Sequence, residues 1–219
     1  MCAERAALPR ELTETGVVAI ARAASTARVG AAVETLVTSG VTCIELTMTM
    51  PGAIDAIAML VKEYGASACI GAGTVLTRDQ ARACVDAGAV FLVAPSAVPE
   101  VVDAAVADGV PCLPGALTPS EVVAAWNAGA AGVKLFPASF GGARYLRDIR
   151  APLPDISLIP TGGISIDDVA GYFEAGAMAV GLGGPLFGDA LAGGDLGKLA
   201  DRASRLLHEV SQARAGGSA

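Results

Sequence analysis

A unit of helix, glycine and strand recurs along this chain and constrains its fold more than any other feature. Glycines that close helical stretches lie 20 to 25 residues apart, with a final interval of 47 residues that spans two units, at Gly40, Gly65, Gly88, Gly109, Gly129 and Gly176. Each of them fits the left-handed residue that ends many helices. An apolar segment follows each glycine, and repetition at this length predicts an array of alternating helices and strands.

Eight apolar segments are predicted to be strands, near Val17–Arg22, Cys43–Thr47, Cys69–Thr74, Phe91–Pro95, Cys112–Gly115, Val133–Phe136, Leu158–Thr161 and Ala179–Leu182. Helix starts lie between them. Thr77 with Gln80 and Thr118 with Glu121 have capping-box spacing, and Pro119 suits a first helical position. Strands that alternate with helices in this number most simply close into a (β/α)8 TIM barrel. We expect one such domain over residues 1–219, with a short N-terminal helical segment and a C-terminal helix.

An open, doubly wound sheet is the alternative fold. Such sheets usually carry a nucleotide-binding signature, and the only candidate, Gly71-Ala72-Gly73-Thr74, lacks the third glycine and the downstream acidic residue. Hydrophobic residues make up 53% of the chain and charged residues 17%, so a sizeable core is expected in either case and disorder is not.

Composition and charge also narrow the function classes. A net charge of −7 without a basic run disfavours nucleic-acid binding. No stretch of about eighteen apolar residues is free of Gly, Pro and charge, and Met1-Cys2-Ala3-Glu4-Arg5 has no apolar signal region, so neither a membrane span nor secretion is expected. His208 is the only histidine, and no CxxC spacing occurs among Cys2, Cys43, Cys69, Cys84 and Cys112. We expect reduced thiols in a cytoplasmic protein that holds no metal and no other cofactor.

Lys134 stands out because it lies inside the apolar segment Gly132-Val133-Lys134-Leu135-Phe136-Pro137. Burying an unpaired ammonium group is costly, so a lysine in such a strand is rarely there for stability. Desolvation disfavours the charged form, which lowers the pKa of the amine and makes the neutral nucleophile available. Such an amine attacks a carbonyl to form a Schiff base, and we predict that Lys134 is catalytic.

Glu45 is the only acidic residue of the predicted strand Cys43–Thr47. Alternation along strands places Glu45 on the face opposite Ile44 and Leu46, and Lys134 on the face opposite its apolar neighbours. If both polar faces point into a barrel, a carboxylate meets an amine. The alternative is a purely structural role, in which Glu45 and Lys134 form an ion pair that only joins two strands. Because such pairs contribute little stability, we favour a catalytic pair.

Two glycine-rich stretches, Pro160-Thr161-Gly162-Gly163-Ile164-Ser165 and Gly181-Leu182-Gly183-Gly184, follow the seventh and eighth predicted strands. In barrels a phosphate is commonly bound here by free backbone N–H groups. The alternative is that they are only tight turns that require positive φ. Thr74, at the end of the third strand, suits a substrate carboxylate or carbonyl, or else a helix cap. Arg22, at the end of the first, suits a carboxylate or phosphate, or else a salt bridge at the rim.

Five motifs together resemble one known family, the 2-keto-3-deoxy-6-phosphogluconate (KDPG) and 4-hydroxy-2-oxoglutarate (KHG) aldolases. The resemblance runs from about Val17 to Phe187, with the motifs in order and at matching spacing. They are Ile44-Glu45-Leu46-Thr47, Gly71-Ala72-Gly73-Thr74-Val75-Leu76, Leu113-Pro114-Gly115, Val133-Lys134-Leu135-Phe136-Pro137-Ala138 and Pro160-Thr161-Gly162-Gly163-Ile164.

The resemblance implies a metal-free class I aldolase on a (β/α)8 barrel, usually a homotrimer. Lys134 matches the Schiff-base lysine and Glu45 the general acid and base. Thr74 matches a contact to the pyruvate carboxylate, and Thr161-Gly162-Gly163 matches the substrate and phosphate loop. The implied reaction cleaves a phosphorylated 2-keto-3-deoxy sugar acid to pyruvate and glyceraldehyde 3-phosphate, or 4-hydroxy-2-oxoglutarate to pyruvate and glyoxylate.

The sequence departs from the family pattern at two positions. Many members carry an arginine where this chain has Thr49, and relatives with threonine there have an arginine at the end of the first strand, which suggests that Arg22 takes over the carboxylate. Many members also have a serine where this chain has Gly184, so a hydroxyl donor to the phosphate is lost.

Other functions remain open to the same residues. A barrel isomerase or epimerase acting on a sugar phosphate would use Glu45 as a base and Lys134 as an electrostatic clamp. A decarboxylase would need a second acid near the lysine strand, and none is seen there. A non-catalytic sensor of sugar-acid phosphates would bind the same small molecule without turning it over.

Overall fold

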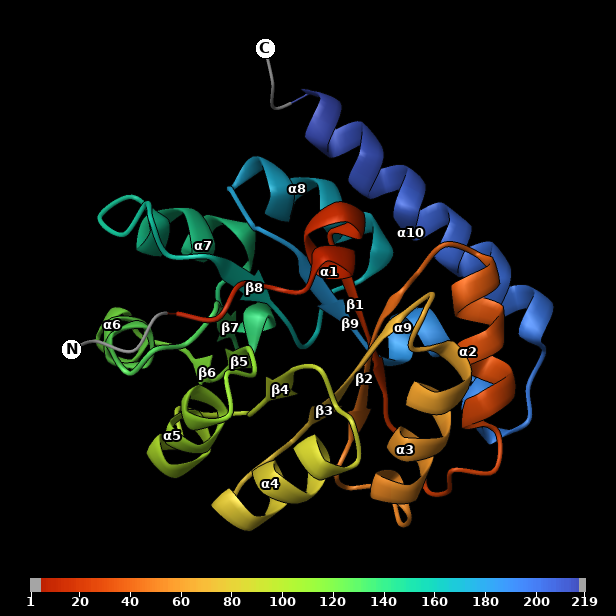
Figure 1. The fold of residues 1–219 in the computed structure, drawn as a ribbon. Coiled ribbons are helices and arrows are strands. Elements are labelled where there is room, and N and C mark those ends of the chain that lie inside the picture. The colour runs from red at the N-terminus through yellow and green to blue at the C-terminus, as the bar shows by residue number, and fades with distance from the viewer. Residues whose placement is uncertain (1–4, 217–219) are drawn as a thin grey trace.

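The computed structural model describes residues 5–216. The predictions that concern Cys2 and the N-terminal residues 1–4 therefore lie outside the described part of the chain. Parallel strands lie at the centre of the molecule and helices surround them (Figure 1). The strands are β1 (Val17–Ala21), β2 (Cys43–Thr47), β3 (Cys69–Gly73), β4 (Leu92–Val93), β5 (Cys112–Leu113), β6 (Gly115–Ala116), β7 (Val133–Leu135), β8 (Leu158–Pro160) and β9 (Val180–Leu182).

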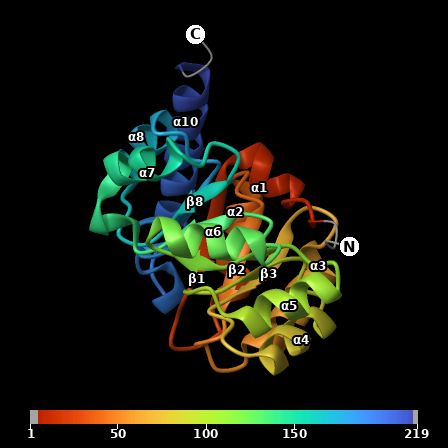
Figure 2. The ribbon, with the colours of Figure 1, turned by 90° about the vertical axis from the view of Figure 1, so that its left-hand side faces the viewer.

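Helices precede, connect and follow these strands. Figure 2 shows α4, α5 and α6 turned toward the viewer, with strands behind them. The α-helices are α1 (Arg10–Thr15), α2 (Val29–Thr38), α3 (Ala53–Tyr64), α4 (Arg78–Asp86), α5 (Pro99–Ala107), α6 (Pro119–Asn127), α7 (Gly142–Arg150), α8 (Val169–Glu174), α9 (Gly184–Phe187) and α10 (Leu196–Gly216). Short 3-10 helices occur at η1 (Ala138–Phe140), η2 (Ile166–Asp168) and η3 (Ala190–Ala192).

The strands are grouped into two parallel sheets, in the orders β5-β4-β3-β2-β1-β9 and β6-β7-β8. The α/β class and the alternation of helices with parallel strands are thus as predicted. The strands were expected to form a single ring of eight, but they form two sheets. One division lies between β8 and β9, and the other falls within the fifth predicted strand, between β5 and β6, at Pro114. Proline has no N–H to donate to a ladder, so regular pairing stops there although the chain continues.

Local signals in the sequence place the helices well. Thr77 accepts a hydrogen bond from the Gln80 backbone at the start of α4, and Thr118 forms a complete capping box with Glu121 at the start of α6. Five of the six repeat glycines have the positive φ expected of a helix end, namely Gly40, Gly88, Gly109, Gly129 and Gly176.

Gly65 is the exception to the predicted helix ends. Its φ is −58°, because the chain makes another turn after α3 before it leaves the helix. In that turn the N–H groups of Ser67 and Ala68 both donate to the carbonyl of Tyr64. The glycine therefore stays in the right-handed region, and the prediction of a left-handed cap there was wrong.

Two apolar clusters separate the inner from the outer face of the strands. The larger joins the outward side chains of the strands to the surrounding helices. The smaller, which we term the inner cluster, lies on the opposite face and consists of Leu12, Val18, Cys43, Cys69, Phe91, Val93, Leu113, Ala131, Ile159 and Ala179. Since side chains alternate along extended backbone, the residues two positions after Cys43 and Ile159, namely Glu45 in β2 and Thr161 just after β8, also face inward.

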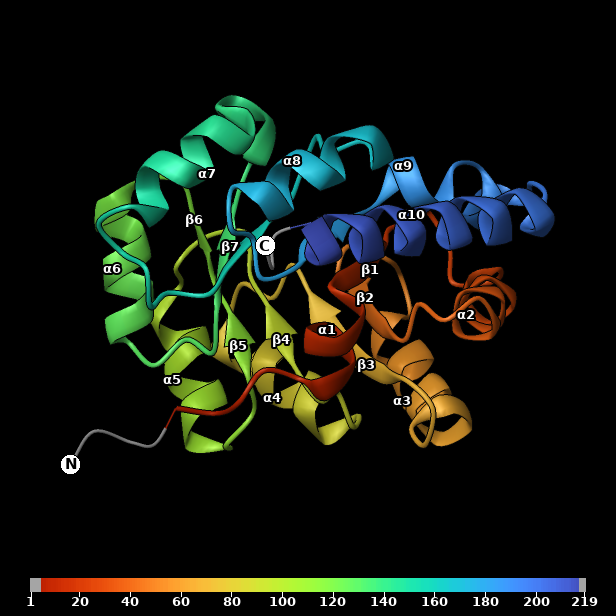
Figure 3. The same ribbon diagram turned by 90° about the horizontal axis from the view of Figure 1, so that it is seen from above.

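The first and last helices lie near each other, and Arg214 of α10 donates a hydrogen bond to the carbonyl of Glu14 in α1 at 2.7 Å. Figure 3 shows α1 over the central strands and α10 along the outside, where it contacts α8 and α2. Leu12 of α1 is fully buried in the inner cluster. Within the described residues, no helix has both the length and the apolar character needed to cross a membrane.

Candidate active site

Lys134 occupies the middle of β7, where it is paired in register with Gly115 of β6 and Ile159 of β8. Its side chain is only 5% exposed. The Nζ atom lies 5.2 Å from the centre of the Phe136 ring, and it makes no hydrogen bond or ion pair with another described residue. A buried primary amine that forms no hydrogen bond or ion pair is suited to react rather than to hold strands together.

Glu45 lies in the middle of β2, in register with Ile20 of β1 and Gly71 of β3. It is 1% exposed, and neither of its carboxylate oxygens has a hydrogen-bond partner. Burial raises the pKa of this carboxyl group, and the positive charges of Lys134 and Arg22 oppose that rise in part. The Glu45 carboxylate therefore lies within electrostatic range of the Lys134 and Arg22 cations. The ion pair between Glu45 and Lys134 that the sequence left as an alternative is not formed.

Gly73, at the end of β3, makes room for the Glu45 carboxylate. A Cβ atom at this position would overlap Oε1, Cδ and Cγ of Glu45. The absent side chain thus leaves the carboxylate lying against the backbone of the next strand. Sequence reasoning noted this glycine only as part of a motif, because its contact with Glu45 depends on the register of two strands.

A cavity of about 180 Å³ lies between the ends of β1, β7, β8 and β9. Six of the predicted binding residues line it: Arg22, Thr161, Gly162, Gly163, Gly183 and Gly184. Phe136 lines it too, which connects the cavity to Lys134 because the Lys134 amine lies over that ring. Lys134, Glu45 and Thr74 are not among the lining residues, so the cavity begins beyond the buried pair.

The two glycine loops present free backbone donors to this cavity. Gly162 and Gly163 both have positive φ, at 89° and 72°, so this loop is also a tight turn that requires glycine, as the alternative interpretation predicted. Among the described residues, the N–H groups of Gly162, Gly163, Gly183 and Gly184 donate no backbone hydrogen bond. Unpaired N–H groups that face one cavity form a site suited to an anion.

Thr161 and Arg22 both line this cavity. The Thr161 side chain is buried, its hydroxyl donates to the carbonyl of Ile159 at 3.3 Å, and a Cβ atom at Gly181 would collide with it. Arg22 is exposed and forms no ion pair with another described residue, so the alternative of a rim salt bridge is wrong. A free guanidinium at the mouth of the cavity suits a planar carboxylate.

Thr74 is the one described residue other than glycine with a positive φ, at 57°. A β-branched residue in this conformation is strained, and such strain is concentrated at functional sites. The alternative role of helix cap is wrong, since Thr77 caps α4. Thr74 follows directly after Gly73, so its side chain emerges beside the strand that cradles Glu45.

The structure adds apolar wall residues that the sequence did not single out. Ile20, Ile164 and Pro185 line the cavity together with Phe136. For Phe136 the sequence did carry a signal, because its position two residues after Lys134 places both side chains on one face of the strand. The other three carried no signal, because apolar residues at strand ends are common in any α/β protein.

The four cysteines within residues 5–216 are buried thiols rather than reactive groups. Cys43, Cys69, Cys84 and Cys112 are all free. Burial raises the pKa of Cys84 to about 11 and that of Cys112 to about 12, which keeps both as neutral thiols. Among the described side chains, no group of three or more His, Cys, Asp or Glu residues is placed to hold a metal ion.

Comparison with known proteins gives one consistent result. The family described as KDPG and KHG aldolase matches residues 8–200. The chain is 36% identical over 190 residues to the probable 2-dehydro-3-deoxy-6-phosphogalactonate aldolase of Rhizobium meliloti (strain 1021), a match that covers 86% of this chain and 90% of the relative.

Solved structures agree with the sequence comparison. A structure described as native KDPGal is similar with a TM-score of 0.86 at 31% identity, over 91% of this chain and 96% of that one. The KDPG aldolase of Legionella pneumophila, with pyruvate captured at low pH as a covalent carbinolamine intermediate, has a TM-score of 0.81 at 26% identity, over 90% of this chain and 96% of that one. With a buried, unpaired lysine and glutamate beside a glycine-lined cavity, the chain belongs to the KDPG and KHG aldolase family.

Proposed function

We propose that this protein is a class I aldolase that cleaves a phosphorylated 2-keto-3-deoxy sugar acid, of the KDPG kind, to pyruvate and glyceraldehyde 3-phosphate. We include 4-hydroxy-2-oxoglutarate as a second substrate. The observation that carries the proposal is a buried lysine that forms no ion pair, within electrostatic range of a buried carboxylate that has no hydrogen-bond partner. The carbinolamine formed by pyruvate in the Legionella pneumophila relative supports the same chemistry.

We infer that the two sheets form one closed (β/α)8 barrel, and that the chain is a single domain. Hydrogen bonds across both gaps between the sheets support this. On one side, Lys134 N–H donates to Pro114 O at 3.0 Å and Ala94 N–H donates to Leu113 O at 3.3 Å, so one chain segment pairs with both neighbours. On the other side, Met178 N–H donates to Leu158 O at 3.0 Å.

The reaction begins with attack of the Lys134 amine on the C2 ketone. Loss of water from the resulting carbinolamine gives an iminium ion, which is an electron sink. Glu45 then removes the proton of the C4 hydroxyl, directly or through water, while the C3–C4 bond breaks. The electron pair of that bond moves to the iminium and forms an enamine, and the aldehyde leaves. Protonation of C3 and hydrolysis of the imine release pyruvate and restore the amine.

The raised pKa of Glu45 suits both halves of this cycle. A carboxyl group whose pKa lies above that of an ordinary glutamate accepts the hydroxyl proton and gives one back to the enamine carbon within one pH range. General acid and base catalysis of this kind contributes about 10²–10⁴-fold to the rate.

In this proposal, different residues of the cavity bind different groups of the substrate. Arg22 and Thr74 bind the carboxylate next to C2, with Arg22 acting in place of the arginine that many relatives carry at the position of Thr49. The N–H groups of Gly162, Gly163, Gly183 and Gly184 bind the phosphate, and Thr161 holds the loop against β9. We also propose that the protein assembles as a homotrimer, which light scattering of the intact protein would test as a mass of three chains.

Borohydride trapping tests the proposal directly. Incubation with pyruvate and borohydride should add one reduced pyruvyl group to Lys134, because reduction of the imine makes the adduct permanent. Peptide mass spectrometry locates it. Lys134→Ala should lose both the adduct and the cleavage of KDPG, while Lys62→Ala, in the polar last turn of α3, should keep both. Cleavage at a near-normal rate by folded Lys134→Ala would refute the mechanism, and binding without turnover by the native protein would indicate a sensor.

A further inference from the structure

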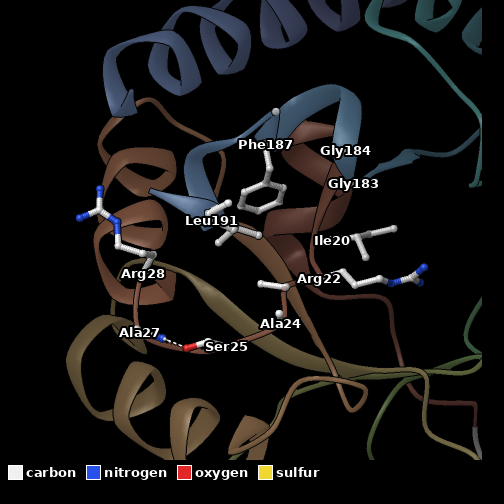
Figure 4. A pocket seen from close by; sticks show the side chains of 13 residues that line it. Ile20, Arg22, Ala24, Ser25, Ala27, Arg28, Gly183, Gly184, Phe187 and Leu191 are labelled. Atoms are coloured by element: carbon white, nitrogen blue, oxygen red, sulfur yellow. Dashed lines mark hydrogen bonds between the residues drawn. The ribbon is translucent and has the colours of Figure 1, made fainter. Parts of the chain in front are cut away.

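A second cavity of about 390 Å³ lies next to the proposed site. It is formed by the connection between β1 and α2, by α9 and by the segment that follows α9 (Figure 4). We call it the outer cavity, and the cavity of the proposed site the inner cavity. Its lining residues are Ile20, Arg22, Ala23, Ala24, Ser25, Ala27, Arg28, Gly183, Gly184, Phe187, Gly188, Leu191 and Ala192.

The outer cavity is adjacent to the inner one and shares part of its wall. Ile20, Arg22, Gly183 and Gly184 line both. The partition between the two cavities therefore consists of two glycines and of side chains at the end of β1. A molecule bound in the inner cavity with its distal end at these glycines faces the entrance to the outer cavity.

Gly184 leaves that entrance open. A Cβ atom at this position would have no heavy atom within 4 Å, and its φ is not positive, so neither space nor backbone conformation requires a glycine here. Any larger residue would place its side chain between the two cavities, whereas glycine leaves the passage clear.

The walls that belong to the outer cavity alone are mainly apolar. Ala24, Phe187 and Leu191 face one another across it in Figure 4, while the guanidinium groups of Arg22 and Arg28 point away from them. The Ser25 hydroxyl accepts a hydrogen bond from the Ala27 N–H at 3.1 Å, so it is already engaged. The cavity therefore offers apolar contact and little that would recognise a charge.

We propose that the outer cavity is a subsite for the aldehyde-derived end of the substrate, and that the protein processes 4-hydroxy-2-oxo acids whose C4 substituent is an extended apolar chain. The inference rests on the proposed aldolase function. In the direction of synthesis, C3 of pyruvate loses a proton and forms a bond to the aldehyde carbon, and the aldehyde oxygen gains a proton. No oxidant or further reactant is needed.

The test compares aldehydes of different length in pyruvate addition. If the proposal holds, the short chain of propanal stays in the inner cavity, whereas the longer chain of hexanal extends into the outer one. Each methylene buried there should improve transition-state binding, so we expect kcat/KM for hexanal to exceed that for propanal by at least about tenfold. Ala24→Leu fills the outer cavity from an exposed loop position and should lower this ratio by about tenfold.

Ala66→Leu is the matched control, because Ala66 is an exposed alanine of another loop and lines neither cavity. It should keep the wild-type ratio. Turnover of KDPG by each variant, measured in parallel, shows that it is folded and separates the two proposals. A wild-type ratio near one, or a ratio that Ala24→Leu leaves unchanged, overturns the subsite. Absence of both KDPG cleavage and the Lys134 adduct overturns the aldolase function itself.

Discussion

Burial of the Glu45 carboxylate couples the ionisation of one side chain to the stability of the whole fold. Glu45 is 1% exposed, its carboxylate oxygens have no hydrogen-bond partner, and burial raises the pKa of the carboxyl group. Its protonated form is therefore favoured in the folded protein. The stability that this provides is fully present below the pKa of an unfolded glutamate, about 4.3. It is lost as the pH rises through the higher pKa of the folded state.

Replacing Glu45 with Gln should change both the rate and the pH dependence of stability. The amide cannot ionise, so the variant should gain stability relative to the native protein as the pH is raised from 4.5 to 8. Urea denaturation at both values measures this. Cleavage of KDPG should fall by about 10²–10⁴-fold, mainly in kcat. Glu34→Gln, which removes an exposed carboxylate from α2, is the control. An equal gain in that variant would contradict the role of burial.

At the scale of elements, the connection from β3 to α4 combines strain with a proposed binding role. Thr74 has a φ of 57°, and the residues beside it are held by neighbouring strands. Met48 N–H donates to Gly73 O at 2.7 Å, and Val75 N–H donates to Val93 O at 3.1 Å. Because both flanking peptides are fixed, the threonine between them cannot relax. Strain that is held in place by the neighbouring strands is typical of functional sites, which supports the proposed binding role of Thr74.

Thr74→Gly should therefore stabilise the fold while impairing the site. Glycine adopts positive φ without strain, and after its greater freedom in the unfolded chain is subtracted we expect a gain of about 1 kcal/mol in the free energy of unfolding. The KM for KDPG should rise, because a donor to the carboxylate is lost. Thr74→Ser keeps the hydroxyl and serves as the control, with KM close to that of the native protein. Loss of stability in Thr74→Gly would show that the conformation is not strained.

At the scale of the whole molecule, the inner cluster links the N-terminal helix to the strands. Leu12 of α1 is fully buried among side chains of β1, β2, β3, β5 and β8. The polar pair, Glu45 and Lys134, lies on the same inner face as this cluster. An apolar base of this kind excludes water from one end of the strands, while the cavity opens at the other.

Leu12→Ala should accordingly destabilise the entire fold rather than α1 alone. Large-to-small substitutions in a packed core cost about 2–5 kcal/mol in the free energy of unfolding, and we expect a value in this range from urea denaturation. The neighbouring Thr13 is only partly buried, and its hydroxyl donates within the same helix, so Thr13→Ala should cost less than about 1 kcal/mol. Similar losses in the two variants would argue against an anchoring role of α1.

Local signals were sufficient to place most elements. The strand predicted at Cys43–Thr47 has the predicted bounds, and the Thr77 and Thr118 caps are formed. Such signals depend on interactions between residues a few positions apart, so they can be identified from the sequence alone. The interruption at Pro114 was visible as a residue, yet the segment around it was predicted as one strand, because its apolar character outweighed a single missing donor.

The sequence by itself determined the chemistry of this protein: an amine and a carboxylate stand out because each interrupts an apolar strand, and that contrast is local. The tertiary structure decided how they are used. It decided that Glu45 forms no ion pair with Lys134, that Gly73 makes room for the Glu45 carboxylate, and that Gly184 lines two cavities. These outcomes depend on distances between strands that are far apart in the chain. Those distances follow from the register and curvature of the sheet, which no single segment specifies.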